Sequence, residues 1–270
     1  MKGVNGTNAL MAASANGFKD VVFMLLEKTS MDVNAVDNNG WSALTMACDR
    51  GWFQIASRLI GNGANVNVRS TFNWTPLMSA CSNGFLDITE LLISKGADVN
   101  VQQDGGWSSL MIASNAGHAA IVEALLKAKA TIYNTKEEIL PGKPSNEIRL
   151  LPDTAIPVIG AVTGGHADVV SILLSRGADP DCIGDDGRTP LMIAASRGSK
   201  GTVTALLKYG ASVPVFNDLG YTLTRLAWVQ VRGALGAGHI DDEHTDSEQL
   251  VTGGGSVPSS AAPKIVEKRD

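Results

Sequence analysis

The sequence is poor in the residues that disulfide frameworks, metal sites and membrane insertion require. Of its 270 residues only three are cysteine and four are histidine, and 5% are aromatic. It contains no run of about 18 apolar residues, the length that a membrane span needs, and no secretory signal precedes residue 6. We therefore expect an intracellular protein, in the cytoplasm, the nucleus or both, with no membrane partner.

The chain also lacks an excess of positive charge. Seven acidic and three basic residues give the segment 239–270 a net charge of −4, so the rest carries −1 of the total −5. A protein that binds nucleic acid should present a basic patch. The charge therefore argues against a nucleic-acid partner.

Catalytic signatures are missing as well. No H-E-x-x-H, paired C-x-x-C, Walker-type or G-x-S-x-G pattern occurs. The four histidines lie at two turns (His118, His166) and near the C-terminus (His239, His244). We therefore expect no enzymatic activity, no metal and no cofactor.

What the sequence does contain is a unit that recurs every 33 residues, the signature of a repeat protein. From Asn73 to Gly105 it reads N-WTPLMSACSNG-FLDITELLISKG-ADVNVQQDG. Thr75 is a good helix N-cap, and Pro76 suits the first helical position. Gly84 fits a left-handed C-cap, and a second apolar stripe runs over 86–93. The pattern predicts helix, turn, helix and a protruding turn, a unit that must stack on neighbours to bury its apolar face.

This unit closely resembles the ankyrin repeat, whose pattern is G-x-T-P-L-H-x-A-A-x-x-G-H, an apolar helix and G-A-D-V-N. The resemblance covers residues 6–235 and implies an all-α solenoid of helix–turn–helix units with β-turn or hairpin fingers. It also implies recognition of another protein on a concave surface formed by the fingers and first helices. The expected repeats are 6–39, 40–72, 73–105, 106–134, 154–186 and 187–219, with a half-repeat at 220–235.

Three segments lie outside this periodicity. Residues 1–5 form a short lead, and 135–153 are an insertion into a finger, either a hairpin or an irregular excursion. Residues 236–270 are acidic and rich in Gly, Ser and Pro, a composition that cannot bury enough apolar surface to order itself. We expect a disordered tail there.

Two of the three cysteines, Cys48 and Cys81, fill the same small-residue position in adjacent repeats. Packed helices lie about 8–10 Å apart, beyond the ~7 Å Cα separation that a disulfide tolerates. The spacing therefore predicts buried free thiols in a reducing compartment.

Three of the five tryptophans occupy one position, just after the fingertip glycine or asparagine, in consecutive repeats. They are Trp41, Trp74 and Trp107, and Arg188 and Tyr221 fill the same position in later repeats. Trp, Tyr and Arg are the residue types enriched in binding hot spots. The pattern favours a partner-binding surface, although the same rings could instead pack together and stiffen the fingers.

The rest of the expected surface comprises one fingertip residue and the polar ends of first helices. These residues are Phe72, Asp49, Arg50, Ser82, Asn83, Asn115 and Arg197. A second aromatic series (Phe18, Trp52, Phe85) lies at the turn between helices, where apolar side chains can cover helix ends.

These features together predict a monomeric, non-catalytic adaptor or scaffold that binds another protein. An alternative is that the chain is the targeting fragment of a larger protein, such as an enzyme, a ubiquitin-ligase subunit or a channel. The abrupt start of the first repeat favours this alternative.

We predict that unfolding divides the array between the fourth and fifth repeats. The insertion falls at this junction, and Ile156 replaces the capping Thr of the fifth repeat, which should cost that helix ~1 kcal/mol. Native-state hydrogen exchange should then show two protection levels. A single cooperative transition with uniform protection from residue 10 to 230 would contradict this prediction.

Overall fold

The computed structural model describes residues 5–28, 30–133, 156–184 and 186–213. These ranges contain twelve helices and no β-strand, which confirms the predicted all-α solenoid. The helices are α1 (Ala9–Ala15), α2 (Lys19–Lys28), α3 (Ala43–Asp49), α4 (Phe53–Gly61), α5 (Pro76–Asn83), α6 (Leu86–Ser94), α7 (Ser109–Ala116), α8 (Ala119–Lys127), α11 (Pro157–Gly164), α12 (Ala167–Ser175), α13 (Pro190–Ser196) and α14 (Lys200–Lys208). The predicted insertion, half-repeat and tail, with Tyr221, lie outside the described residues.

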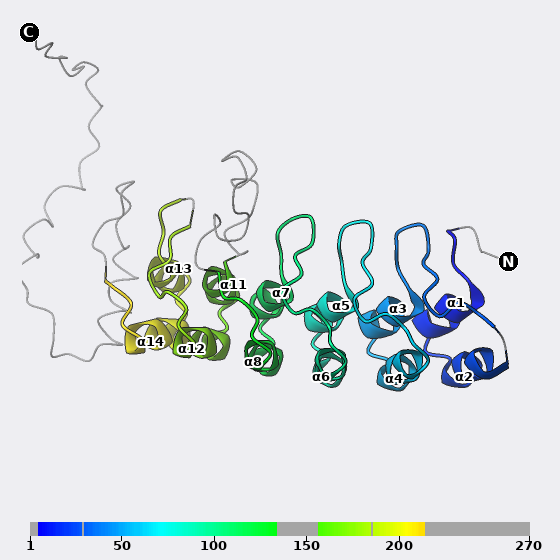
Figure 1. The fold of residues 1–270 in the computed structure, drawn as a ribbon. Coiled ribbons are helices and arrows are strands. Elements are labelled where there is room, and N and C mark those ends of the chain that lie inside the picture. The colour runs from blue at the N-terminus through cyan, green and yellow to red at the C-terminus, as the bar shows by residue number, and fades with distance from the viewer. Residues whose placement is uncertain (1–4, 29, 134–155, 185, 214–270) are drawn as a thin grey trace, which may run out of the picture.

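The helices form two parallel rows (Figure 1). In each repeat an inner helix (α1, α3, α5, α7, α11, α13) is followed by an outer one, and loops project from the inner row as fingers. Each inner helix packs on the next inner helix, and outer helices pair in the same way. The helix pair α7 and α8 packs directly on α11 and α12, so the stack is continuous across residues 134–155.

Local sequence explains where the inner helices begin. The side chains of Ser42, Thr75 and Ser108 each accept a hydrogen bond from the backbone N–H three residues later, which confirms the cap predicted at Thr75. Thr189 caps α13 in the same way, whereas Ile156 provides no side-chain cap for α11.

The core is a seam of aliphatic side chains between neighbouring repeats. Leu44, Leu77 and Leu110 occupy one position at 33-residue intervals, and Leu44 and Leu110 are fully buried while Leu77 is 1% exposed. Burying such a side chain stabilises the fold by about 1.5–3 kcal/mol. No described helix has the length and apolar character needed to cross a bilayer.

The three cysteines lie in or beside this seam as free, buried thiols. Burial raises the pKa of Cys81 to about 12, and it raises the pKa of Cys48 further. Burial and then the neighbouring carboxylates of Asp179 and Asp181 raise the pKa of Cys182 to about 12. The thiols are therefore protonated and unreactive at neutral pH.

The aromatic series at the turns links each repeat to the one before it. The Trp52 ring lies against Gly17, where an added Cβ would lie 2.6 Å from the indole, and Trp52 Nε1 donates to Ala15 O at 3.3 Å. Phe85 covers Gly51 in the same way. These glycines also have φ near +75°, which disfavours other residues, so both the backbone and the ring require glycine. Phe18, with no described repeat before it, is 59% exposed.

Asparagines form a second, polar link between repeats. Asn67 Nδ2 donates to Gly96 O at 3.0 Å, and its Oδ1 accepts from Asp98 N at 2.8 Å. Asn34 and Asn100 make the same pair of bonds with the repeats that follow them. In the fourth repeat Tyr133, which has no side-chain amide, occupies this position.

We predict that Asn67→Ala lowers the free energy of unfolding by about 1 kcal/mol, because two hydrogen bonds between repeats are lost at an exposed position. Urea denaturation measures this loss. Asn115→Ala is the matched control, since the exposed side chain of Asn115 makes no hydrogen bond to a described residue. Equal losses in the two variants would show that the bonds of Asn67 contribute no stability.

Candidate partner-binding surface

Each tryptophan of the first series ends the tight turn that forms a fingertip. A backbone N–H four residues earlier donates to its carbonyl oxygen in every case: Asp37 to Trp41 at 3.0 Å, Ser70 to Trp74 at 2.9 Å and Gln103 to Trp107 at 3.1 Å. The side chain at the start of the turn also accepts from backbone N–H groups inside it, as Asp37 does from Asn39 and Trp41. The three fingers therefore have one shape.

The fingers are also joined to one another. Thr71 N donates to Asn39 O at 2.9 Å, and Asp104 N donates to Phe72 O at 3.1 Å. The Asn73 side chain adds a bond to the Asp104 carboxylate at 2.6 Å. Backbone hydrogen bonds thus hold the fingers of the second, third and fourth repeats in a fixed order.

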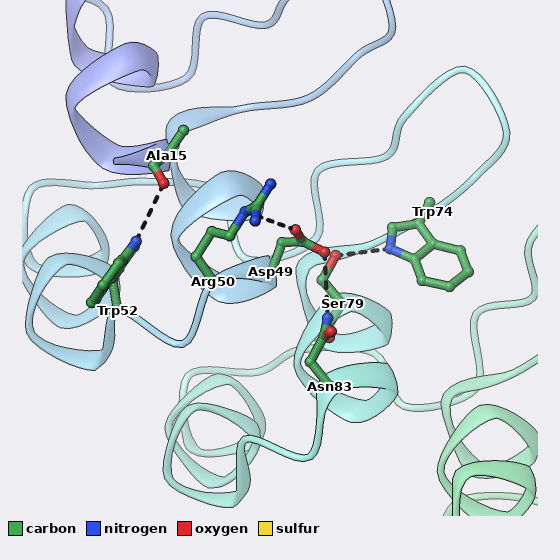
Figure 2. A network of polar contacts seen from close by, with 7 residues as sticks. All are labelled: Ala15, Asp49, Arg50, Trp52, Trp74, Ser79 and Asn83. Carbon is green, nitrogen blue, oxygen red and sulfur yellow. Dashed lines mark hydrogen bonds and ion pairs between the residues drawn. The ribbon is translucent and has the colours of Figure 1, made fainter. Parts of the chain in front are cut away.

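The tryptophan rings differ in how they pack. Trp74 and Trp107 lie against a small cluster of buried side chains formed by Met78, Val101 and Ile112. Trp74 Nε1 also donates to Ser79 Oγ at 2.8 Å (Figure 2). Trp41 belongs to neither hydrophobic cluster, and all three rings remain partly exposed. Trp74 and Trp107 therefore pack against buried core residues, whereas Trp41, which is also partly buried, lies outside the two clusters.

A polar network connects the ends of two inner helices beside Trp74 (Figure 2). Arg50 Nε lies 3.5 Å from Asp49 Oδ2, and Asn83 Nδ2 donates to Asp49 Oδ1 at 3.3 Å. Asn83 Nδ2 also donates to Ser79 O at 2.9 Å. The network brings together four of the residues expected to contact a partner, Trp74, Asp49, Arg50 and Asn83.

The remaining expected residues fall into two groups. Phe72 is 67% exposed at a fingertip, and Ser82 and Asn115 are exposed at the ends of α5 and α7, in the repeats that carry Trp74 and Trp107. Arg188 and Arg197 are exposed in the sixth repeat, with the fifth repeat between them and the rings. Arg188 forms an ion pair with Asp186.

Sequence reasoning missed Ser79, which orients the Trp74 ring. Its position holds Met46 in the previous repeat and Ile112 in the next, so the repeat pattern carries no signal for a hydrogen-bonding residue there. Among the described residues, no group of three or more His, Cys, Asp or Glu is placed to hold a metal ion.

Comparison with solved structures shows the same architecture elsewhere. The ankyrin repeat domain of human ASB11 superposes with a TM-score of 0.69 at 28% identity, over 85% of this chain and 96% of that one. A profile of ankyrin repeats (three copies) matches residues 1–70, 50–136 and 138–226.

Individual relatives match over short stretches. BCL-6 corepressor-like protein 1 of Homo sapiens is 50% identical over 62 residues, 23% of this chain and 4% of that protein. Potassium channel AKT2/3 of Arabidopsis thaliana is 39% identical over 64 residues (24% and 8%). The probable E3 ubiquitin-protein ligase XBOS31 of Oryza sativa subsp. japonica is 41% identical over 58 residues (22% and 13%). The matched stretches thus span a small part of each relative, whereas the repeat profile spans most of this chain, and the chain belongs to the ankyrin repeat family.

Proposed function

We propose that the chain is a non-catalytic adaptor or scaffold that binds a partner protein through the tryptophan surface. This surface comprises Trp41, Phe72, Trp74 and Trp107 with the polar helix ends Asp49, Arg50, Ser82, Asn83 and Asn115. The observation that carries the proposal is the presence of three partly exposed tryptophans in one position of three hydrogen-bonded fingers. Large aromatic side chains held in a rigid frame lose little entropy on binding and are typical of hot spots.

Trp41 supports the binding role most directly. Its ring is partly exposed and lies outside both hydrophobic clusters, so it contributes less to the core than Trp74 and Trp107 do. Trp74 and Trp107 combine packing with exposure, and the exposed part of each ring extends the same surface.

The proposal includes the cellular location and the oligomeric state of the protein. Three free, buried thiols are typical of a reducing compartment, which supports a location in the cytoplasm, the nucleus or both. We place the module there as a monomer.

A second candidate function is that of a targeting segment in a larger protein. The relatives that match it include a potassium channel and a probable ubiquitin-protein ligase, and the matched stretch covers 8% and 13% of them. Sequencing the full-length transcript tests this candidate, because a catalytic or channel domain in the same reading frame is its requirement.

We predict that Trp74→Ala lowers the free energy of unfolding by about 2 kcal/mol, because it removes packing against Met78, Val101 and Ile112 and leaves Ser79 without its partner. Trp41→Ala should cost less, about 1 kcal/mol, because this ring contacts neither buried cluster. Urea denaturation of both variants decides between packing and binding as the role of each ring. A loss for Trp41→Ala as large as for Trp74→Ala would mean that Trp41 is structural.

We predict that Trp41→Ala reduces capture of the partner protein from a cell lysate at least ~10-fold, as truncation of a hot-spot residue does. The matched control is Trp52→Ala, which removes the same side chain from the turn series and should leave capture unchanged. Circular dichroism verifies that both variants remain helical. Undiminished capture by Trp41→Ala would show that the partner binds elsewhere.

A further inference from the structure

We infer that the tryptophan surface binds a polyproline-II segment that carries proline at every third position. The inference rests on the proposed function and specifies the chemistry of the partner. Three observations carry it: the spacing of the rings, the state of their indole N–H groups, and the internal pairing of the neighbouring charges.

The spacing of the rings follows from the fingers. Each finger is two chain segments wide, and hydrogen-bonded neighbouring segments lie about 4.8 Å apart. Because adjacent fingers are joined by the bonds from Thr71 N to Asn39 O and from Asp104 N to Phe72 O, equivalent residues recur about every 10 Å. The inner helices below them pack about 8–10 Å apart, which agrees with this value.

This interval fits one turn of polyproline II. That helix has three residues per turn and rises 3.1 Å per residue, or about 9.3 Å per turn. Residues i, i+3 and i+6 would then meet Trp41, Trp74 and Trp107 in turn. A β-strand does not fit, because its side chains alternate between faces and residues three apart point in opposite directions.

The indole N–H groups distinguish polyproline II from an α-helix, which repeats one face over a similar distance in seven residues. Within the part of the chain that the structure describes, the N–H groups of Trp41 and Trp107 donate to nothing, whereas that of Trp74 is bound to Ser79. An α-helix has no free carbonyl oxygens in its middle, since it uses them internally. Polyproline II has no internal hydrogen bonds, so its carbonyl oxygens can accept from both indoles.

The charges beside the rings favour an uncharged ligand. The Asp49 carboxylate is paired with Arg50 and Asn83, and the Asp104 carboxylate accepts from Asn73. Asp37 accepts from two backbone N–H groups of its own finger. A charged segment would have to replace these bonds, whereas a proline segment leaves them intact. Its conformation is also formed before binding, which lowers the entropic cost.

The test measures binding of three synthetic peptides to the ¹⁵N-labelled full chain by NMR. The first, acetyl-PAAPAAPAAP-amide, carries proline at every third residue. The second, acetyl-PPPPAAAAAA-amide, has the same composition without the period, and the third, acetyl-KAAKAAKAAK-amide, has the period with cations. We expect the first to bind at least ~10-fold more tightly than the other two. Its binding should shift the indole N–H signals of Trp41 and Trp107 but not that of Trp52.

The indole donors are tested separately with Trp41→Phe, which keeps an aromatic ring and removes the N–H. It should weaken binding of the first peptide about 3–10-fold, the effect of one hydrogen bond. Equal affinity for the first two peptides, tighter binding of the lysine peptide, or unshifted Trp41 and Trp107 signals at ~1 mM peptide would overturn the inference.

Failure of this inference is distinguishable from failure of the proposed function. If Trp41→Ala abolishes capture of a partner while the proline peptide does not bind, the surface is correct and its ligand class is wrong. If Trp41→Ala leaves capture intact, the surface itself is wrong.

Discussion

The structure depends on one constraint: no helical hairpin in this array can bury its apolar face without a neighbour. Leu44, Leu77 and Leu110 are buried because each lies in the seam between one repeat and the next. Core stability is therefore shared along the stack, as in a one-dimensional array with nearest-neighbour terms. The position of each finger is fixed by the same contacts, so the geometry of the tryptophan surface is a property of the stack and not of any single repeat.

Polar and aromatic links then set the register within this stack. The bonds of Asn67, the Trp52 ring over Gly17 and the backbone bond from Thr71 to Asn39 each join adjacent repeats at a different height. Each bond contributes roughly 1 kcal/mol, far less than the aliphatic seam. Their effect is directional, because they fix how one repeat is turned relative to the next. Regular spacing of the rings follows from this register.

Features that depend only on residues close together in the chain were predictable from the sequence. The cap at Thr75 and the glycine end at Gly84 each involve a residue and its close neighbours, and the structure contains both. Links that cross between repeats were not predictable in the same way. Asn67 reaches residues 29 and 31 positions away, so its role emerges only when the repeats are stacked.

The tryptophan position was predictable, but the environment of each ring was not, because the next repeat provides part of it. Trp74 packs against Met78, Val101 and Ile112.

The equivalent positions around Trp41 hold Thr45, Val68 and Ser79, and Ser79 is already bonded to Trp74. Two polar residues thus replace two apolar ones, which explains why Trp41, unlike Trp74 and Trp107, lies outside both clusters.

The stacking of the repeats also limits how far the tryptophan surface extends. Arg188 lies two repeats beyond Trp107, roughly 20 Å along the stack. Between them, α11 ends at Gly164 and is capped by Gly165, and neither glycine offers a side chain to a ligand. A short segment bound on the rings would therefore not reach Arg188 or Arg197. A partner that contacts both the rings and these arginines must do so through separate parts of its chain.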